Sequence, residues 1–100
     1  MKVIVESPYK GQNEADRKKN REFARKCMLD SLKKGESPFL SHLLYTQVLD
    51  EDVESERRIG LEAAFKWYEV ADYVVVYTDR GITKGMTLLH CFFCTMGSLF

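Results

Sequence analysis

The sequence predicts an α/β fold, a Rossmann-like three-layer αβα domain with a short parallel sheet in the order β-α-β-α-β-α. The main indication is the run YVVVY at residues 73–77, where β-branched and aromatic residues follow one another without a polar interruption. Such a run is typical of a strand that is buried on both faces. A second apolar run, VIV at residues 3–5, opens the chain, and helical patterns lie between the two. This alternation is typical of right-handed crossovers in a parallel sheet.

The first strand is expected at residues 2–6, and a long helix is expected at about residues 14–34. Asn13 can cap the start of this helix, and Gly35 can end it. Its apolar residues recur at three- and four-residue spacing, which places them on one buried face. They are Phe23, Ala24, Cys27, Met28 and Leu32.

Ser37 and Pro38 favour an extended chain, so a short second strand is expected at residues 39–41. An irregular or briefly helical connection follows at residues 42–49. A second helix is expected at about residues 53–69, with Phe65 and Trp67 in the core. Its apolar residues occupy many faces, which suits a helix pressed between the sheet and a neighbour.

The third strand is expected at residues 72–77, and Thr83 can cap a third helix from about residue 84. Residues 88–100 carry no charge unless His90 is protonated, and no further strand is expected there. Two explanations stay open for this atypical segment: a wholly buried terminal helix, or a tail docked on another subunit. The chain is otherwise expected to be one domain, residues 1–100.

The charges are balanced, with 15 Lys and Arg against 15 Asp and Glu, which argues against general nucleic-acid binding. The charges are unevenly placed, because residues 10–34 are basic and residues 50–56 are acidic. The two segments can be solvated surfaces, or they can take part in the recognition of a partner. No secretory signal pattern and no apolar run of about 20 residues occurs, so no membrane association is expected. An odd count of three cysteines favours reduced thiols and a cytoplasmic protein. A domain this short buries a limited share of its surface, so a homodimer that buries more of it is a natural expectation.

The carboxyl ends of the first and third strands are the predicted ligand site, because open α/β sheets bind ligands there. After the first strand, Ser7 offers a hydroxyl, Tyr9 offers a ring that can stack on a base or sugar, and Gly11 permits close backbone approach. Backbone N–H groups at the following helix start favour a phosphate or carboxylate. An ordinary turn between strand and helix is the alternative interpretation.

The loop after the third strand begins with Asp79, which can accept sugar hydroxyls, transfer a proton or simply close an Asx turn. His42 is a weaker candidate, because a lone histidine often has a structural role. The remaining expected ligand-binding residues follow Asp79 on the same loop. They are Gly81, Thr83, Gly85 and Met86.

Neither a cofactor nor a metal is expected. The loops lack the GxGxxG pattern of nicotinamide-binding proteins. His90, Cys91 and Cys94 supply three ligand types from one apolar segment, whereas a structural zinc site needs four. Buried thiols are the preferred interpretation of these cysteines.

Five segments, taken in order, resemble nucleoside 2-deoxyribosyltransferase-like proteins. They are VIVESPY (3–9), PFLSHL (38–43), ERRIG (56–60), ADYVVVY (71–77) and GITKGM (81–86). The similarity covers about residues 1–88 and is closest to small, mostly uncharacterised members from phage and bacterial genomes. It implies a nucleoside or nucleotide site at the carboxyl edge of the sheet, and active relatives cleave or transfer the N-glycosidic bond.

The resemblance also implies a carboxylate nucleophile at or just after residues 85–86, where Thr87, Leu88, Leu89 and His90 follow, and none is acidic. The second acidic position of the family corresponds to Ala64. Glu62 can substitute only if it points into the crevice. Family members usually continue with a strand that supports the site. We therefore expect a nucleotide- or nucleoside-binding domain without efficient N-glycosidic chemistry, and whether any enzymatic activity remains stays open.

Two other functions stay open at this point. One is a small phage-encoded interaction protein that inhibits a host or defence protein, suggested by the vacant acidic positions, the segregated charge and the apolar tail. The other is a residual nucleoside or nucleotide N-glycosidase.

Overall fold

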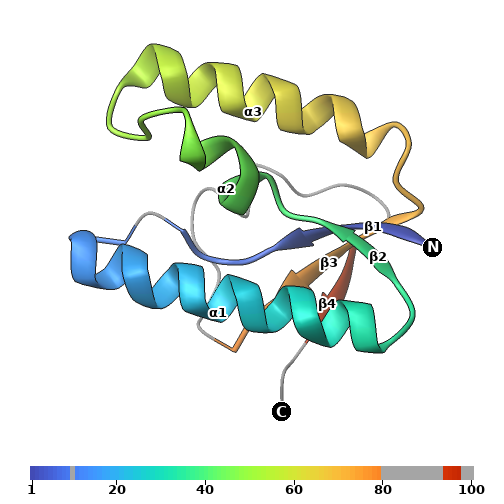
Figure 1. The fold of residues 1–100 in the computed structure, drawn as a ribbon. Helices are drawn as coiled ribbons and strands as arrows, with labels where there is room; N and C mark the ends of the chain where they lie inside the picture. Colours follow the sequence, from blue (N-terminus) through green and yellow to red (C-terminus); the bar gives the residue numbers. More distant parts are fainter. Residues whose placement is uncertain (10, 80–93, 98–100) are drawn as a thin grey trace.

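The computed structural model of the chain describes residues 1–9, 11–79 and 94–97 (Figure 1). Within these residues, four parallel strands form one sheet in the order β2-β1-β3-β4. The strands are β1 (Lys2–Glu6), β2 (Ser37–Phe39), β3 (Tyr73–Tyr77) and β4 (Cys94–Gly97). The α/β, Rossmann-like prediction is confirmed.

Helices cover both faces of the sheet. Figure 1 shows α1 (Glu14–Lys33) on one side and α3 (Glu54–Tyr68) on the other. A short helix α2 (Ser41–Leu44) and a 3₁₀ turn η1 (Tyr45–Gln47) connect β2 to α3, as the expected briefly helical segment. No helix among the described residues is long and apolar enough to cross a membrane.

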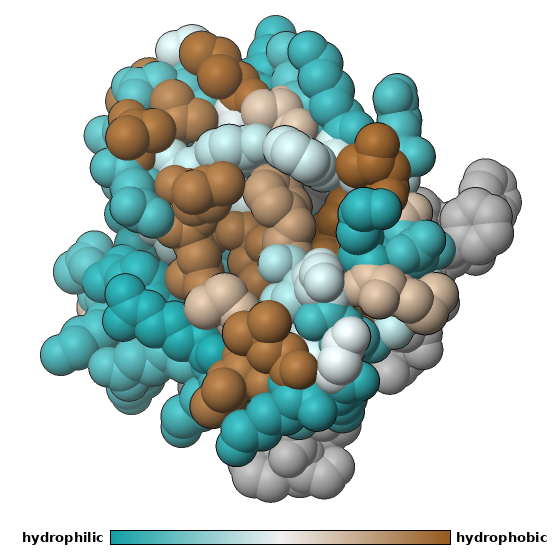
Figure 2. Space-filling view, turned by 45° about the vertical axis from the view of Figure 1, so that its right-hand side comes forward, coloured by the Kyte–Doolittle hydropathy of each residue, from teal (hydrophilic) through white to brown (hydrophobic). Residues whose placement is uncertain are grey.

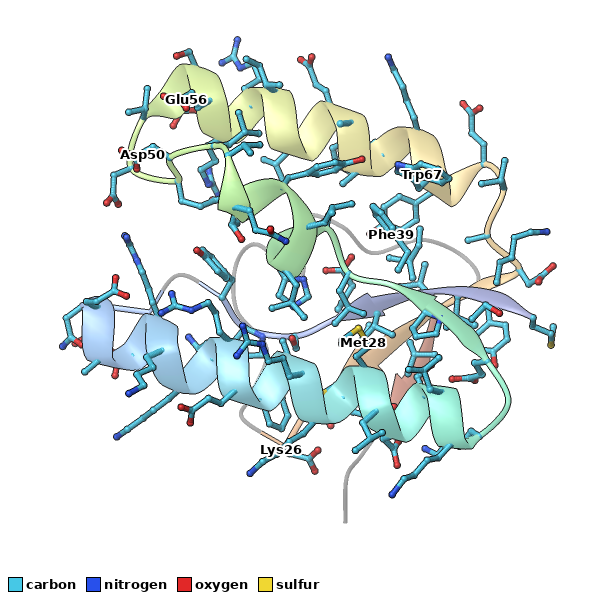
Figure 3. All side chains as sticks on the ribbon, viewed as in Figure 1. Lys26, Met28, Phe39, Asp50, Glu56 and Trp67 are labelled. Carbon is cyan, nitrogen blue, oxygen red and sulfur yellow. The ribbon has the colours of Figure 1, made fainter. Side chains whose placement is uncertain are left out.

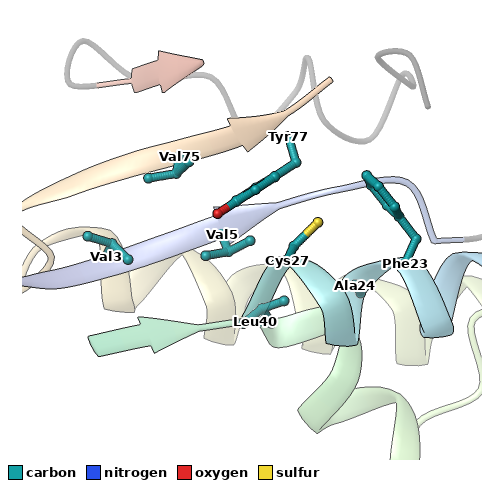
Figure 4. Packing of buried hydrophobic residues seen from close by; sticks show 8 residues of the cluster. All are labelled: Val3, Val5, Phe23, Ala24, Cys27, Leu40, Val75 and Tyr77. Atoms are coloured by element: carbon teal, nitrogen blue, oxygen red, sulfur yellow. The ribbon is translucent and has the colours of Figure 1, made fainter. Parts of the chain in front are cut away.

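The alternation of side chains along the strands divides the core into two clusters. On the α1 side, strand residues pack against Phe23, Ala24 and Cys27 of the helix (Figure 4). On the α3 side, residues of β1 and β3 pack with Phe39, Tyr68 and Ala71. The strand residues of the first cluster are Val3, Val5, Val75 and Tyr77. Those of the second are Ile4, Val74 and Val76.

The predicted caps of α1 are both present. The Asn13 side chain accepts a hydrogen bond from the backbone N–H of Asp16 at 2.9 Å. Gly35 adopts a φ of 84°, and the N–H of Glu36 reaches back to the carbonyl of Ser31 at 3.1 Å, which closes a Schellman motif. One expectation on this helix is wrong, because Leu32 is 53% exposed. Ser31 takes the buried position instead, and the next residue is rotated about 100° away from it.

The second strand begins earlier than predicted, at Ser37 instead of residue 39. The N–H of Ser37 donates to the carbonyl of Met1 at 2.7 Å, and Lys2 pairs with Ser37, so the register with β1 starts here. Pro38 is accommodated because β2 is an edge strand. Ser41, expected in the strand, begins α2.

The expectation that no strand follows residue 88 is wrong. Strand β4 pairs in parallel with β3 from Val74–Cys94 to Tyr77–Gly97, and it satisfies the edge of β3 that would otherwise be open. A Cβ atom on Gly97 would lie 2.7 Å from Cγ1 of Val75, so the two strands approach closely there. The strand also excludes a terminal helix over residues 94–97. The expected third helix from residue 84, with His90 and Cys91, lies outside the described residues.

Helix α3 is more exposed than predicted. Phe65 and Trp67 are 44% and 46% exposed, and Ala64 is the buried residue of this helix. The prediction that Phe65 and Trp67 lie in the core is therefore wrong. Trp67 instead lies beside Phe39 of the edge strand, with ring centroids 5.1 Å apart (Figure 3). Figure 2 shows apolar side chains gathered on one face between hydrophilic margins.

Tyr77 connects the core to a surface ion pair. Its ring is fully buried, and its hydroxyl donates to Oδ2 of Asp30 at 2.7 Å, where Lys34 also binds at 2.8 Å. Tyr77→Phe should lower the free energy of unfolding by about 1.5–3 kcal/mol, because it removes one hydrogen bond to a carboxylate and leaves the ring packing intact. Urea unfolding of the variant measures this loss. A cost above about 3 kcal/mol would contradict the assignment of the hydroxyl to a single hydrogen bond.

Candidate functional site

The strand order places a topological switch point between β1 and β3. The chain leaves β1 toward β2 on one side and continues from β3 toward β4 on the other. In parallel sheets a ligand crevice forms outside the carboxyl ends of the strands at such a point. Glu6 pairs with Val76, so the loops that start at Ser7 and Thr78 leave the sheet next to each other. The geometry thus brings together the starts of the two predicted site loops.

Ser7, His42 and Tyr9 converge at this edge. Ser7 Oγ and His42 Nε2 share a hydrogen bond of 2.7 Å, although the residues are 35 positions apart. The ring of Tyr9 lies edge-on to that of His42, with centroids 6.4 Å apart and an interplanar angle of 76°. Burial lowers the pKa of His42 to about 4, so the imidazole is neutral near pH 7. His42, the weaker candidate of the sequence analysis, therefore lies against Ser7 and Tyr9 of the loop that follows β1.

The position of Tyr9 is fixed by a residue that the sequence analysis did not single out. Asn20 is 5% exposed on α1, and its Nδ2 donates to the backbone carbonyl of Tyr9 at 3.0 Å. Gly11 adopts a φ of 62°, and a Cβ atom there would lie 2.4 Å from Cβ of Asp16. The absence of a side chain at Gly11 therefore lets the loop backbone approach helix α1 closely.

The start of α1 is poorly suited to an anion. Asn13 and Asp16 accept the N–H groups of Asp16 and Gln12 at 2.9 and 3.0 Å. Glu14 and Asp16 add negative charge to the first turn. Two arginines of α1 are ion-paired, Arg17 with Asp52 at 2.6 Å and Arg21 with Glu14 at 3.1 Å. The predicted preference of this helix start for phosphate or carboxylate is not supported.

Asp79 is exposed and follows β3 by two residues. Burial, and then the charges of Asp79 and Asp30, raise the pKa of the Cys27 thiol to about 12. The other predicted site residues lie outside the described residues. They are Gly81, Thr83, Gly85 and Met86, together with the expected nucleophile positions 87–90.

Glu6 is a buried carboxyl at the same edge that the sequence analysis missed. It is the last residue of β1 and is 5% exposed. The hydroxyl of Tyr68 donates to its Oε1 at 2.6 Å. Burial raises the pKa of Glu6 from 4.5 to about 7, and the Tyr68 hydrogen bond opposes this rise. The available signal was an acidic residue directly after the apolar run VIV and still within the strand.

Helix α3 does not supply a second carboxylate to this edge of the sheet. Ala64, the position that the family resemblance assigns to an acid, is 4% exposed. Glu62 is exposed and lies two residues earlier, about 200° around the helix from Ala64. It therefore points away from the sheet, and its substitution for the missing acid is not supported. Within residues 1–9, 11–79 and 94–97, no group of three or more metal-ligating side chains is arranged to hold a metal ion.

The fold and this edge define a small α/β domain with a candidate ligand site at the switch point of its sheet. A family model described as "Domain of unknown function (DUF7768)" matches residues 1–89, and the chain belongs to this family. The match includes β1, β3 and the residues directly after each of these strands. Comparisons with curated proteins and with solved structures gave no match.

Proposed function

We propose that this domain binds a nucleoside- or nucleotide-type small molecule at the carboxyl ends of β1 and β3, without efficient cleavage of its N-glycosidic bond. The convergence of Ser7, His42 and Tyr9 at the switch point carries the proposal. A hydroxyl beside a neutral imidazole can exchange hydrogen bonds with sugar hydroxyls or a base edge. An aromatic ring at the same edge provides a stacking surface. The resemblance to nucleoside 2-deoxyribosyltransferase-like proteins supports this class of ligand.

The proposed lack of efficient chemistry is supported by the absence of carboxylates at the positions where the family resemblance implies them. Glycosyl transfer through a covalent intermediate needs a carboxylate at the anomeric carbon and an acid for the leaving group. Ala64 occupies one family position, and the exposed Glu62 points away from the sheet. A residual N-glycosidase stays a minor proposal. Its test is base release from deoxynucleosides, which should persist in Glu62→Gln.

A thermal-shift titration with nucleosides, nucleotides and deoxynucleoside monophosphates tests ligand binding. A ligand at a hundredfold excess over its Kd should stabilise the folded protein by about 2.7 kcal/mol. Ser7→Ala should weaken binding about three- to tenfold, because one hydrogen bond is lost. Tyr9→Ala should also weaken it. Ser37→Ala is the matched control, since Ser37 is exposed at the start of β2, at the opposite edge of the sheet.

Retention of full affinity by folded Ser7→Ala and Tyr9→Ala proteins would show that the site is wrongly placed. A flat response to the whole panel at millimolar concentration would contradict the proposed ligand class. It would favour the interaction protein instead.

A second candidate function, binding of a host or defence protein, is supported by an exposed apolar surface on α3 and the segment after it. Ile59, Trp67 and Val70 are 56%, 46% and 54% exposed, and exposed apolar patches mark interaction sites. The segregated charge is partly explained inside the chain, because Arg17 of the basic segment pairs with Asp52 of the acidic one.

Homodimerisation through the same surface, a phage origin and a cytoplasmic location remain proposals. Sedimentation of the wild type and of Trp67→Ala measures self-association directly.

A further inference from the structure

We propose that Glu6 is a proton-carrying carboxyl of the ligand site, which binds as a neutral acid and selects an uncharged nucleoside over its phosphate. The inference rests on the proposed function and names the substrate class of the same site. Four observations carry it: the position of Glu6, its burial, its hydrogen-bond partner, and the charges at the start of α1.

Glu6 and Ser7 flank the carboxyl end of the central strand. Alternate residues of a strand project to the same face, so Glu6, the last residue of β1, shares the α3 face with Ile4, and Tyr68 of α3 bonds to it there. Because β1 lies between β2 and β3, this strand end is the middle of the switch-point edge. Ser7 follows Glu6 directly, so a ligand seated at this strand end would meet both the Ser7–His42 pair and Glu6.

The surroundings of Glu6 favour its neutral form. The α3 face next to it is formed by the apolar side chains of Ile4, Val74 and Val76. Tyr68 is the titratable group that bonds to Glu6 on that face, and no Lys, Arg or His among the described residues pairs with it. A buried carboxylate without a cation is costly, and burial accordingly raises the pKa of Glu6 to about 7.

A neutral carboxylic acid presents one donor and one acceptor side by side, whereas a carboxylate only accepts. The donor–acceptor pair matches the amide or amidine edge of a nucleobase. A phosphate would instead face a carboxyl that ionises near neutral pH and an acidic first turn of α1. Among the described residues near this edge, His42, Arg17 and Arg21 keep a constant charge in the relevant range. His42, with a pKa of about 4, is neutral above about pH 6, and Arg17 and Arg21 remain ion-paired cations.

The experiment measures calorimetric binding of the common deoxynucleosides and their 5′-monophosphates between about pH 6 and pH 9. At least one nucleoside should bind, its monophosphate should bind no tighter, and nucleoside affinity should fall about tenfold per pH unit above the pKa of Glu6. Glu6→Gln keeps a donor and an acceptor, so it should bind with little pH dependence. Tyr68→Phe removes the hydrogen bond that lowers the Glu6 pKa, so its affinity should persist to higher pH.

Carboxyl ¹³C NMR distinguishes a Glu6 carboxyl that contacts the ligand from one that has a structural role only. Binding of the nucleoside should raise the Glu6 pKa further, which a carboxyl remote from the ligand would not show. Nucleoside affinity independent of pH, a monophosphate that binds tenfold tighter, or an unmoved Glu6 titration would each overturn this inference and leave the proposed function standing. Absence of binding by every compound to the folded protein would overturn both.

Discussion

Glu6→Gln should raise the free energy of unfolding at about pH 8 by about 3 kcal/mol and should have little effect near pH 4. The pKa of Glu6 rises from 4.5 to about 7 on folding. Between these values the folded state holds a proton that the unfolded state has lost. This contribution to stability is present at low pH and is lost as the pH rises through 7. Glutamine keeps the acceptor for Tyr68 and cannot ionise, so it avoids the loss.

His42 should give a pH dependence of the opposite sign. Its pKa falls from 6.5 to about 4 on folding, because burial disfavours the imidazolium. Between these values the unfolded state binds the extra proton, so stability is complete above about pH 6.5 and is lost as the pH falls toward 4. The loss amounts to about 3 kcal/mol. His42→Gln should remove it.

The two titrations overlap between about pH 4.5 and pH 6.5. In the wild type their slopes, each about 1.4 kcal/mol per pH unit, oppose each other and leave stability nearly flat in this window. Glu6→Gln should reveal a stability that rises with pH, and His42→Gln one that falls with pH. Urea unfolding at a series of pH values measures both. Glu62→Gln is the control, because Glu62 is exposed on α3. Parallel curves for wild type and Glu6→Gln would contradict the burial argument.

The sequence predicted the elements whose signals are local. The apolar runs of β1 and β3 and the capped helix α1 lie within one or two residues of their predicted bounds. The start of β2 was misplaced because its register depends on the bond from Ser37 to Met1, which joins distant segments. Strand β4 was missed because CTMG has no strong strand pattern of its own and pairs with a β3 edge formed elsewhere.

The sequence predicted the location of the candidate site better than it predicted which side chains meet there. Strand order and loop position indicated Ser7 and Tyr9, since both follow the first apolar run directly. The contact between Ser7 and His42 depends on how β2 aligns with β1, and spacing along the chain does not encode it. Glu6 escaped notice because an acid at a strand end is ordinarily exposed to water. Its burial depends on Tyr68, which is 62 positions away in the chain.

Gly11→Ala should lower the free energy of unfolding by about 2–5 kcal/mol, because two costs add. An alanine at a φ of 62° adopts the left-handed region, which costs about 1–2 kcal/mol. Its Cβ would also lie 2.4 Å from Cβ of Asp16, and relief of such overpacking typically costs about 1–3 kcal/mol. The loop must then move away from α1, which breaks the bond from Gln12 N–H to Asp16 and displaces Tyr9 from Asn20.

Gly35→Ala is the matched control for this prediction. Gly35 has a φ of 84°, and a Cβ atom there would meet nothing within 4 Å, so only the backbone cost of about 1–2 kcal/mol applies. The stiffening of the unfolded chain is the same in both variants and cancels in the comparison. Gly11→Ala should therefore lose more stability than Gly35→Ala and should also weaken nucleoside binding through Tyr9. Equal losses in urea unfolding would mean that the loop is not packed against α1, and the placement of Tyr9 beside His42 would then lose its structural basis.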